Sequence, residues 1–130
     1  MKQKTIWVID DDMIYQIIIQ KIIKKSTLFS GISTFVDGNE ALNALKNALE
    51  NNEILPDIIL LDINMPIMDG WEFMEEITLL KSQINKRIDI YIVSSSIAVE
   101  DKHMAKTYPD ILGYLSKPVT LDDLIKIAFF

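Results

Sequence analysis

Carboxylates follow two of the apolar runs in this sequence, each at the point where the run ends. Asp10 and Asp11 come directly after residues 6–9, and Asp62 comes directly after residues 58–61. Short runs of branched apolar residues are typical of strands that are buried on both faces of a parallel sheet. A carboxylate at the tip of such a strand is held by a rigid scaffold. It also reaches the crevice outside the sheet, where open α/β sheets bind ligands.

A hydroxyl and an ammonium group follow two later apolar runs. Ser94 comes directly after the fourth run, with Ser95 and Ser96 as alternatives for the same position, and Lys117 follows the fifth run. Because parallel strands direct their carboxyl ends to one edge of a sheet, we expect these side chains to converge with the three aspartates.

The combination of these groups suits a phosphoryl group. Three carboxylates in one crevice repel one another and raise one another's pKa values, so they require a cation. Oxygen ligands favour Mg²⁺, which keeps waters and often binds a phosphoryl oxygen as well. With a hydroxyl and an ammonium beside it, Asp62 can be the nucleophile that forms an aspartyl phosphate. Taken alone, Asp62 could equally cap the turn that follows it.

The elements that must position these groups alternate between strand and helix. Strands are predicted at residues 6–9, 31–36, 58–61, 88–93 and 111–115, and helices at residues 13–25, 40–50, 70–81, 99–107 and from Thr120 or Asp122 onward. This alternation indicates an α/β fold, with a five-stranded parallel sheet that carries helices on both faces. We expect Asp12 to be the N-cap of the first helix.

Length and composition exclude several classes of protein. The chain has 130 residues, of which 49% are hydrophobic, so it is sized for one domain with a real core. The lack of Cys excludes thiol catalysis and suits a reducing, cytoplasmic compartment. A net charge of −6 argues against a large nucleic-acid-binding face, and no apolar run approaches membrane-spanning length. The single histidine, His103, is interpreted as a solvated helix residue.

Four segments in order along the chain resemble the receiver domain of bacterial two-component response regulators, in its single-domain, chemotaxis-regulator-like form. They are residues 8–12, 61–70, 93–96 and 113–118. The resemblance covers essentially the whole chain, so residues 1–130 are interpreted as one receiver domain. It implies a flavodoxin-like, doubly wound sheet with strand order 2-1-3-4-5.

The resemblance also implies an acceptor and a metal site. Asp62 is then the phosphoacceptor. Mg²⁺ is bound by Asp11 directly, by Asp10 mainly through water, by Asp62 and by the backbone carbonyl of Asn64.

Lys117, Ser94 and Tyr114 are implied to respond to the phosphoryl group. Lys117 pairs with the acceptor and then with the phosphoryl group, which Ser94 moves to hydrogen-bond. Tyr114 turns inward when Ser94 moves, although a half-buried strand tyrosine with its hydroxyl in water is a common alternative. The Lys117–Pro118 peptide is implied to be cis.

The implied partners are proteins. A histidine kinase or histidine phosphotransfer protein phosphorylates Asp62, and the output is a contact with a downstream protein. The domain is expected to bind neither nucleic acid nor membrane, and to be a monomer or a weak phosphorylation-dependent dimer. It would catalyse only its own phosphorylation and dephosphorylation.

Three alternatives stay open. A degenerate receiver would act only as a protein-binding module. A magnesium-dependent phosphatase with an aspartyl nucleophile, like those of the haloacid-dehalogenase-like families, would carry a second Asp where Asn64 stands. The chain could also be part of a longer kinase or regulator.

The first predicted helix is more apolar than one buried face requires. Two adjacent stripes run along it, one at residues 14, 18 and 22 and the other at residues 15, 19 and 23. We expect Tyr15, Ile19 or Ile23 to be partly exposed and to dock a partner helix. The alternative is a helix packed deeply between its neighbours.

Overall fold

The predicted strands and helices are all present in the computed structural model, which describes residues 2–95 and 97–130. No end differs from the predicted one by more than two residues. Ser96, one of the alternatives to Ser94, lies outside the described residues. Of the described helices, none is long and apolar enough to span a membrane. In chain order the elements are β1 (Lys4–Ile9), α1 (Met13–Ser26), β2 (Phe29–Phe35), α2 (Gly38–Glu50), β3 (Ile58–Leu61), α3 (Gly70–Leu79), η1 (Lys81–Gln83), β4 (Asp89–Ser94), α4 (Val99–Lys106), β5 (Ile111–Ser116) and α5 (Leu121–Ala128).

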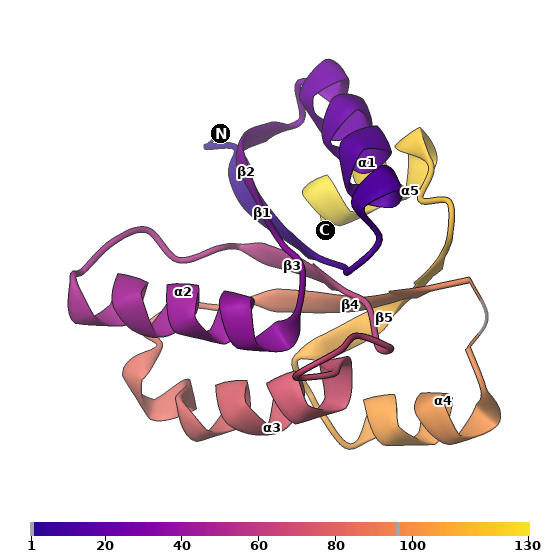
Figure 1. The fold of residues 1–130 in the computed structure, drawn as a ribbon. Helices are drawn as coiled ribbons and strands as arrows, with labels where there is room; N and C mark the ends of the chain where they lie inside the picture. The colour runs from indigo at the N-terminus through magenta and orange to yellow at the C-terminus, as the bar shows by residue number, and fades with distance from the viewer. Residues whose placement is uncertain (1, 96) are drawn as a thin grey trace.

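The five strands form one parallel sheet in the order β2-β1-β3-β4-β5, which confirms the predicted topology. Helices α1 and α5 lie over one face, and α2, α3 and α4 cover the other (Figure 1). All strand carboxyl ends therefore meet at one edge. The strand order reverses around β1 and β3, so the ligand crevice of such a sheet lies outside the tips of these two strands.

Strand β1 shows how the sheet separates two cores. Ile6 and Val8 belong to the core under α1 and α5, whereas Trp7 and Ile9 belong to the core under α2 and α3. Successive side chains of a strand point to opposite faces. Asp10 continues the first of these two sets, so the chain places it on the side of the sheet that α1 and α5 cover.

Helix α1 buries a different stripe from the one expected. Ile19 and Ile23 are only 1% and 2% exposed, so the prediction that either docks a partner is wrong. They share the inward face with the buried Gln16, because residues three and four apart lie on one side of a helix. Tyr15 is half-buried. The exposed apolar residues of α1 are instead Met13, Ile14, Ile17 and Ile18.

Side-chain caps mark the starts of α1 and α5, which the sequence had also placed. The Asp12 carboxylate accepts hydrogen bonds from the backbone N–H groups of Ile14 and Tyr15, which confirms the predicted N-cap of α1. Thr120 caps α5 in a reciprocal pair with Asp123, and this decides between the two predicted starts of that helix.

Gly70 begins α3 in direct contact with the backbone at the tip of β3. Its N–H donates to the carbonyl of Ile63 at 2.8 Å. A Cβ atom at this position would lie 2.5 Å from the carbonyl oxygen of Asp62 and 2.9 Å from the Cα of Ile63. Since both contacts are with backbone, Gly70→Ala should lower the free energy of unfolding by about 2–3 kcal/mol, measured by urea denaturation.

Gly31→Ala is the matched control for this prediction. The nearest atom to a Cβ at Gly31 is Cγ2 of Thr5, at an ordinary contact distance of 3.8 Å. This variant should stay within about 0.5 kcal/mol of the wild type. Equal losses of stability in the two alanine variants would contradict the steric explanation.

Candidate functional site

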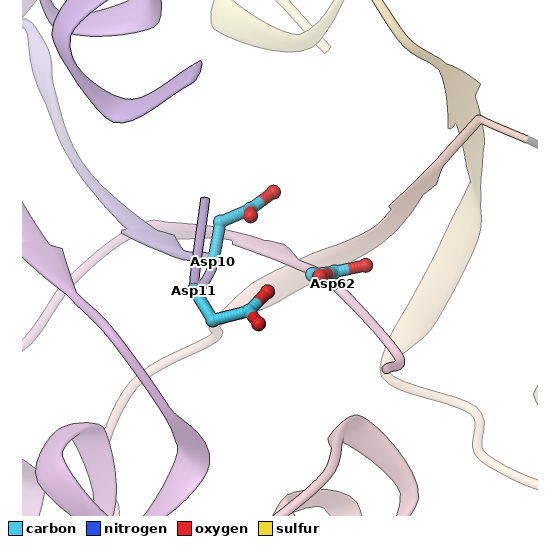
Figure 2. A group of neighbouring side chains, drawn as sticks. All are labelled: Asp10, Asp11 and Asp62. Atoms are coloured by element: carbon cyan, nitrogen blue, oxygen red, sulfur yellow. The ribbon is translucent and has the colours of Figure 1, made fainter. Parts of the chain in front are cut away.

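Three aspartates meet at the carboxyl edge of the sheet, as their positions in the sequence predicted. One carboxylate oxygen each from Asp10, Asp11 and Asp62 lies within 4.8 Å of the other two (Figure 2). Asp10 and Asp62 are buried, with exposed fractions of 1% and 7%, whereas Asp11 is exposed. The cluster therefore has two buried carboxylates and one that is open to water. Oxygen ligands in this arrangement fit a hard divalent cation such as Mg²⁺.

The pairing of β1 with β3 sets the separation between these carboxylates. Ile9 is in register with Leu61, and the N–H of Asp62 donates to the carbonyl of Ile9 at 2.9 Å. The acidic residues that follow the two strands are therefore side by side. The Asp62 Oδ1 atom accepts a hydrogen bond from the N–H of Ile63 at 2.9 Å, and this bond orients the carboxylate.

A buried glutamine, which the sequence analysis missed, ties α1 to the tips of two strands. The Gln16 Nε2 atom donates to the carbonyls of Asp10 at 2.9 Å and Phe35 at 2.8 Å. Its signal in the sequence is a polar residue within the inward apolar stripe of α1. Because buried carbonyls need donors, this side chain holds the first turn of α1 against the site.

The ammonium group of Lys117 pairs with Asp10. Its Nζ atom lies 2.7 Å from Oδ2 of Asp10, whereas the resemblance implied a pairing with Asp62. Asp10 is the more deeply buried carboxylate, so an adjacent cation offsets a larger desolvation cost there. The N–H of Lys117 donates to the carbonyl of Ser94 at 3.0 Å, which joins the tips of β4 and β5. The peptide to Pro118 is cis, as implied.

The ionised form of the Asp62 carboxylate is disfavoured by its surroundings. Burial raises the pKa of Asp62 to about 6, and the negative charges of Asp10 and, to a smaller extent, Asp11 contribute to the rise. The charge of Lys117 and the hydrogen bond from Ile63 act in the opposite direction. An ionised Asp62 therefore gains from any cation that enters the crevice.

The other predicted site residues lie on β4, on β5 and in the loop after β3. Ser94 ends β4 and is 6% exposed, and Asn64 is exposed in the loop between β3 and α3. Tyr114 of β5 is 39% exposed, with the Lys102 Nζ atom 6.0 Å from its ring centroid. The tyrosine ring therefore lies at the surface, and its inward movement stays a prediction.

Comparison with known proteins identifies the family. The model of the response regulator receiver domain matches residues 6–129. The chain belongs to this family. Receiver domains of this family act in two-component signalling systems, so the three-aspartate cluster lies in a signalling module.

The receiver resembles both short and long relatives. It is 31% identical over 126 residues to response regulator Rcp1 of Synechocystis sp. This alignment covers 96% of this chain and 84% of that protein. It is 27% identical over 128 residues to the DNA-binding transcriptional regulator NtrC of Salmonella typhimurium, which covers 98% of this chain but only 24% of that protein.

A solved structure shares the fold of this receiver. The Mn²⁺-bound form of response regulator Rcp1 matches with a TM-score of 0.74 at 28% identity, over 96% of this chain and 88% of that one.

Asp62→Asn should stabilise the metal-free protein near neutral pH. The pKa of Asp62 rises from its usual value of 3.8 to about 6 on folding, so the folded state binds more protons between these pH values. The contribution of Asp62 to stability is therefore present below pH 4 and is lost as the pH rises toward 6. Asparagine keeps the shape of the side chain without the charge.

The measurement is urea denaturation of both proteins in chelator at pH 4 and pH 7. The variant should be more stable by about 1–2 kcal/mol at pH 7, with most of this difference gone at pH 4. A difference of the same size at both pH values would contradict the assignment.

Proposed function

We propose that residues 1–130 act as one receiver domain that takes a phosphoryl group from a phosphohistidine onto Asp62. The donor would be a histidine kinase or a histidine phosphotransfer protein in the cytoplasm, and the output a contact with a target protein. The observation that carries this proposal is the convergence of three carboxylates at one crevice, with the Lys117 ammonium at its side. Within the described residues, these three aspartates are the one group of three or more His, Cys, Asp or Glu side chains placed to hold a metal ion.

The transfer exchanges one bond to phosphorus for another. The bond from phosphorus to the histidine nitrogen breaks as a bond to a carboxylate oxygen of Asp62 forms, and the imidazole leaves with the electron pair of the broken bond. The hydrogen bond from Ile63 holds the carboxylate in a fixed orientation during the attack. Lys117, which is close enough to lower the pKa of Asp62, is placed to balance charge on the phosphoryl oxygens.

A divalent cation would complete the site. Asp10, Asp11 and Asp62 would hold Mg²⁺ together with the carbonyl of Asn64, and the Mn²⁺-bound form of Rcp1 supports this choice of metal class. When bound, the ion neutralises negative charge that gathers on the transferring group. In its absence the buried carboxylates repel both one another and the incoming phosphoryl group, so we expect transfer to depend on the metal.

The phosphoryl group would then shift the protein between two states. A ligand moves such an equilibrium only through its different affinity for the two states. Here that difference would come from new bonds to Ser94 and Lys117, at the joined tips of β4 and β5. Tyr114 of β5 would follow Ser94 inward and change the surface that α4 and β5 present. The domain would catalyse only its own phosphorylation and dephosphorylation.

The exposed side of α1 is a candidate docking surface for the phosphohistidine donor. Met13, Ile14, Ile17 and Ile18 are between 49% and 72% exposed within the first turns of this helix. The helix follows the site directly, because Asp12 caps it next to Asp11. A partner that covers these apolar side chains would bring a phosphohistidine to the open side of the crevice.

Intact-mass spectrometry after incubation with acetyl phosphate tests the acceptor. The wild type should gain one phosphoryl group in Mg²⁺ and none in chelator, because the metal offsets the repulsion of the buried carboxylates. Asp62→Asn should gain none under either condition. A folded, Mg²⁺-replete wild type that stays unmodified would overturn the proposal and favour a receiver that only binds protein.

Ile14→Glu tests the docking surface. Ile14 is 72% exposed, so the change should not disturb the fold. The donor is a purified phosphohistidine protein that phosphorylates the wild type. Transfer from it to the variant should be about tenfold slower, since a charge replaces an apolar contact. The rate with acetyl phosphate should stay unchanged.

Ile54→Glu is the control, because Ile54 is 81% exposed and precedes β3 at the opposite edge of the sheet. This variant should match the wild type with both phosphodonors. An Ile14→Glu protein that slows with both donors, or with neither, would contradict the assigned surface.

A further inference from the structure

Tyr15 forms the α1 side of the site, and the proposed function gives it no role. Its ring centroid lies 4.7 Å from Nζ of Lys117. The same Nζ atom lies 2.7 Å from Oδ2 of Asp10. The ammonium group therefore has two contacts, one with a carboxylate and one with the face of an aromatic ring. A cation at this distance from a ring is attracted by the ring's quadrupole.

The position of the Tyr15 ring is well determined by its surroundings. Its backbone N–H donates to the Asp12 carboxylate at 3.1 Å, within the cap that starts α1. The next residue, Gln16, is bonded to the carbonyls at the tips of β1 and β2. The Tyr15 side chain packs against the core under α1 and α5. The ring is thus held in place beside the long side chain of Lys117.

The hydroxyl group of Tyr15 does not explain why a tyrosine, rather than another residue, stands at this position. Its oxygen is buried and has no hydrogen-bond partner within residues 2–95 and 97–130. Burial raises the pKa of this phenol, and the nearby charges of Asp10, Asp62 and Asp123 raise it further, so the side chain stays neutral. The contact that explains a tyrosine here is therefore the contact of its ring with Lys117.

We propose that Tyr15 is a positioning residue, whose ring holds the Lys117 ammonium at the edge of the phosphorylation site. The inference rests on the proposed function, because it assigns Lys117 a role in transfer to Asp62. A lysine side chain without such a contact samples many rotamers. The ring restricts them, so that a positive charge is already in place when the phosphoryl group arrives.

The test compares Tyr15→Phe with Tyr15→Leu. Phenylalanine keeps the ring and removes the hydroxyl, whereas leucine keeps apolar packing and removes the ring. The measurement is the rate constant of phosphorylation by phosphoramidate in Mg²⁺, from intact-mass time courses. Tyr15→Leu should be about five- to tenfold slower than the wild type, and Tyr15→Phe should stay within about twofold.

Ile22→Ala controls for a general loss of packing. Ile22 packs against the same core under α1 and α5, two turns further along the helix. This variant should be less stable in urea and still phosphorylate within about twofold of the wild-type rate. If it slows as much as Tyr15→Leu, the effect of Tyr15 is structural and the proposal is overturned.

The remaining outcomes of this comparison also test the proposal. A folded Tyr15→Leu protein at the wild-type rate overturns the proposal, as does a Tyr15→Phe protein as slow as Tyr15→Leu. If the leucine variant does not fold, Tyr15→Met removes the ring with a flexible apolar side chain, and the same criteria apply. A wild type that phosphoramidate leaves unmodified shows instead that the proposed function itself fails, and this inference falls with it.

Discussion

The register of β1 against β3 brings negative charges together that water would keep apart. Ile9 pairs with Leu61, so the residues that follow them, Asp10 and Asp62, are neighbours at the edge of the sheet. Both are buried, and the exposed Asp11 lies within the same cluster. Burial and mutual repulsion make the ionised state of this site unfavourable, and the raised pKa of Asp62 reflects both causes. The rest of the site compensates for this repulsion.

Several groups partly compensate for this repulsion. Lys117 supplies a positive charge from the tip of β5, and the N–H of Ile63 supplies a hydrogen bond from the loop after β3. Gln16 fixes the first turn of α1 to the carbonyl ends of β1 and β2. The compensation is incomplete, since the pKa of Asp62 stays above its usual value. A cation that enters the crevice therefore stabilises the ionised carboxylates, because it offsets the repulsion that Lys117 and the N–H of Ile63 leave uncompensated.

Helix α1 connects the chemistry of the site to its surroundings through opposite faces. Its inward face carries Gln16, Ile19 and Ile23, and it holds the helix to the sheet. Tyr15 lies between the two faces and contacts the ammonium of Lys117. The outward face presents four apolar side chains to water next to the mouth of the crevice. A single helix therefore contacts the Lys117 ammonium through one side chain and presents an apolar surface to water through others.

The sequence by itself determined the fold class and the acidic cluster. Apolar runs and turn residues are local signals, and the alternation of strand with helix allows few topologies. Since parallel strands end at one edge, Asp10, Asp11 and Asp62 could be placed together from the order of the elements alone. The cap of α1 by Asp12 was predictable because it is a local contact: a capping side chain lies within a few residues of the N–H groups that it binds.

Only the tertiary structure decided which groups touch. An isoleucine-rich helix offers more than one apolar stripe, and the stripe that is buried depends on how α1 rotates against the sheet and α5. For that reason Ile19 and Ile23, expected at the surface, lie in the core, while Ile14 and Ile18 face water. The resemblance implied Asp62 as the partner of Lys117, but a long side chain at a strand tip can reach several carboxylates, and it pairs with Asp10. The fold brings both Asp10 and the ring of Tyr15 to the Lys117 ammonium, and these contacts join residues that are distant in sequence.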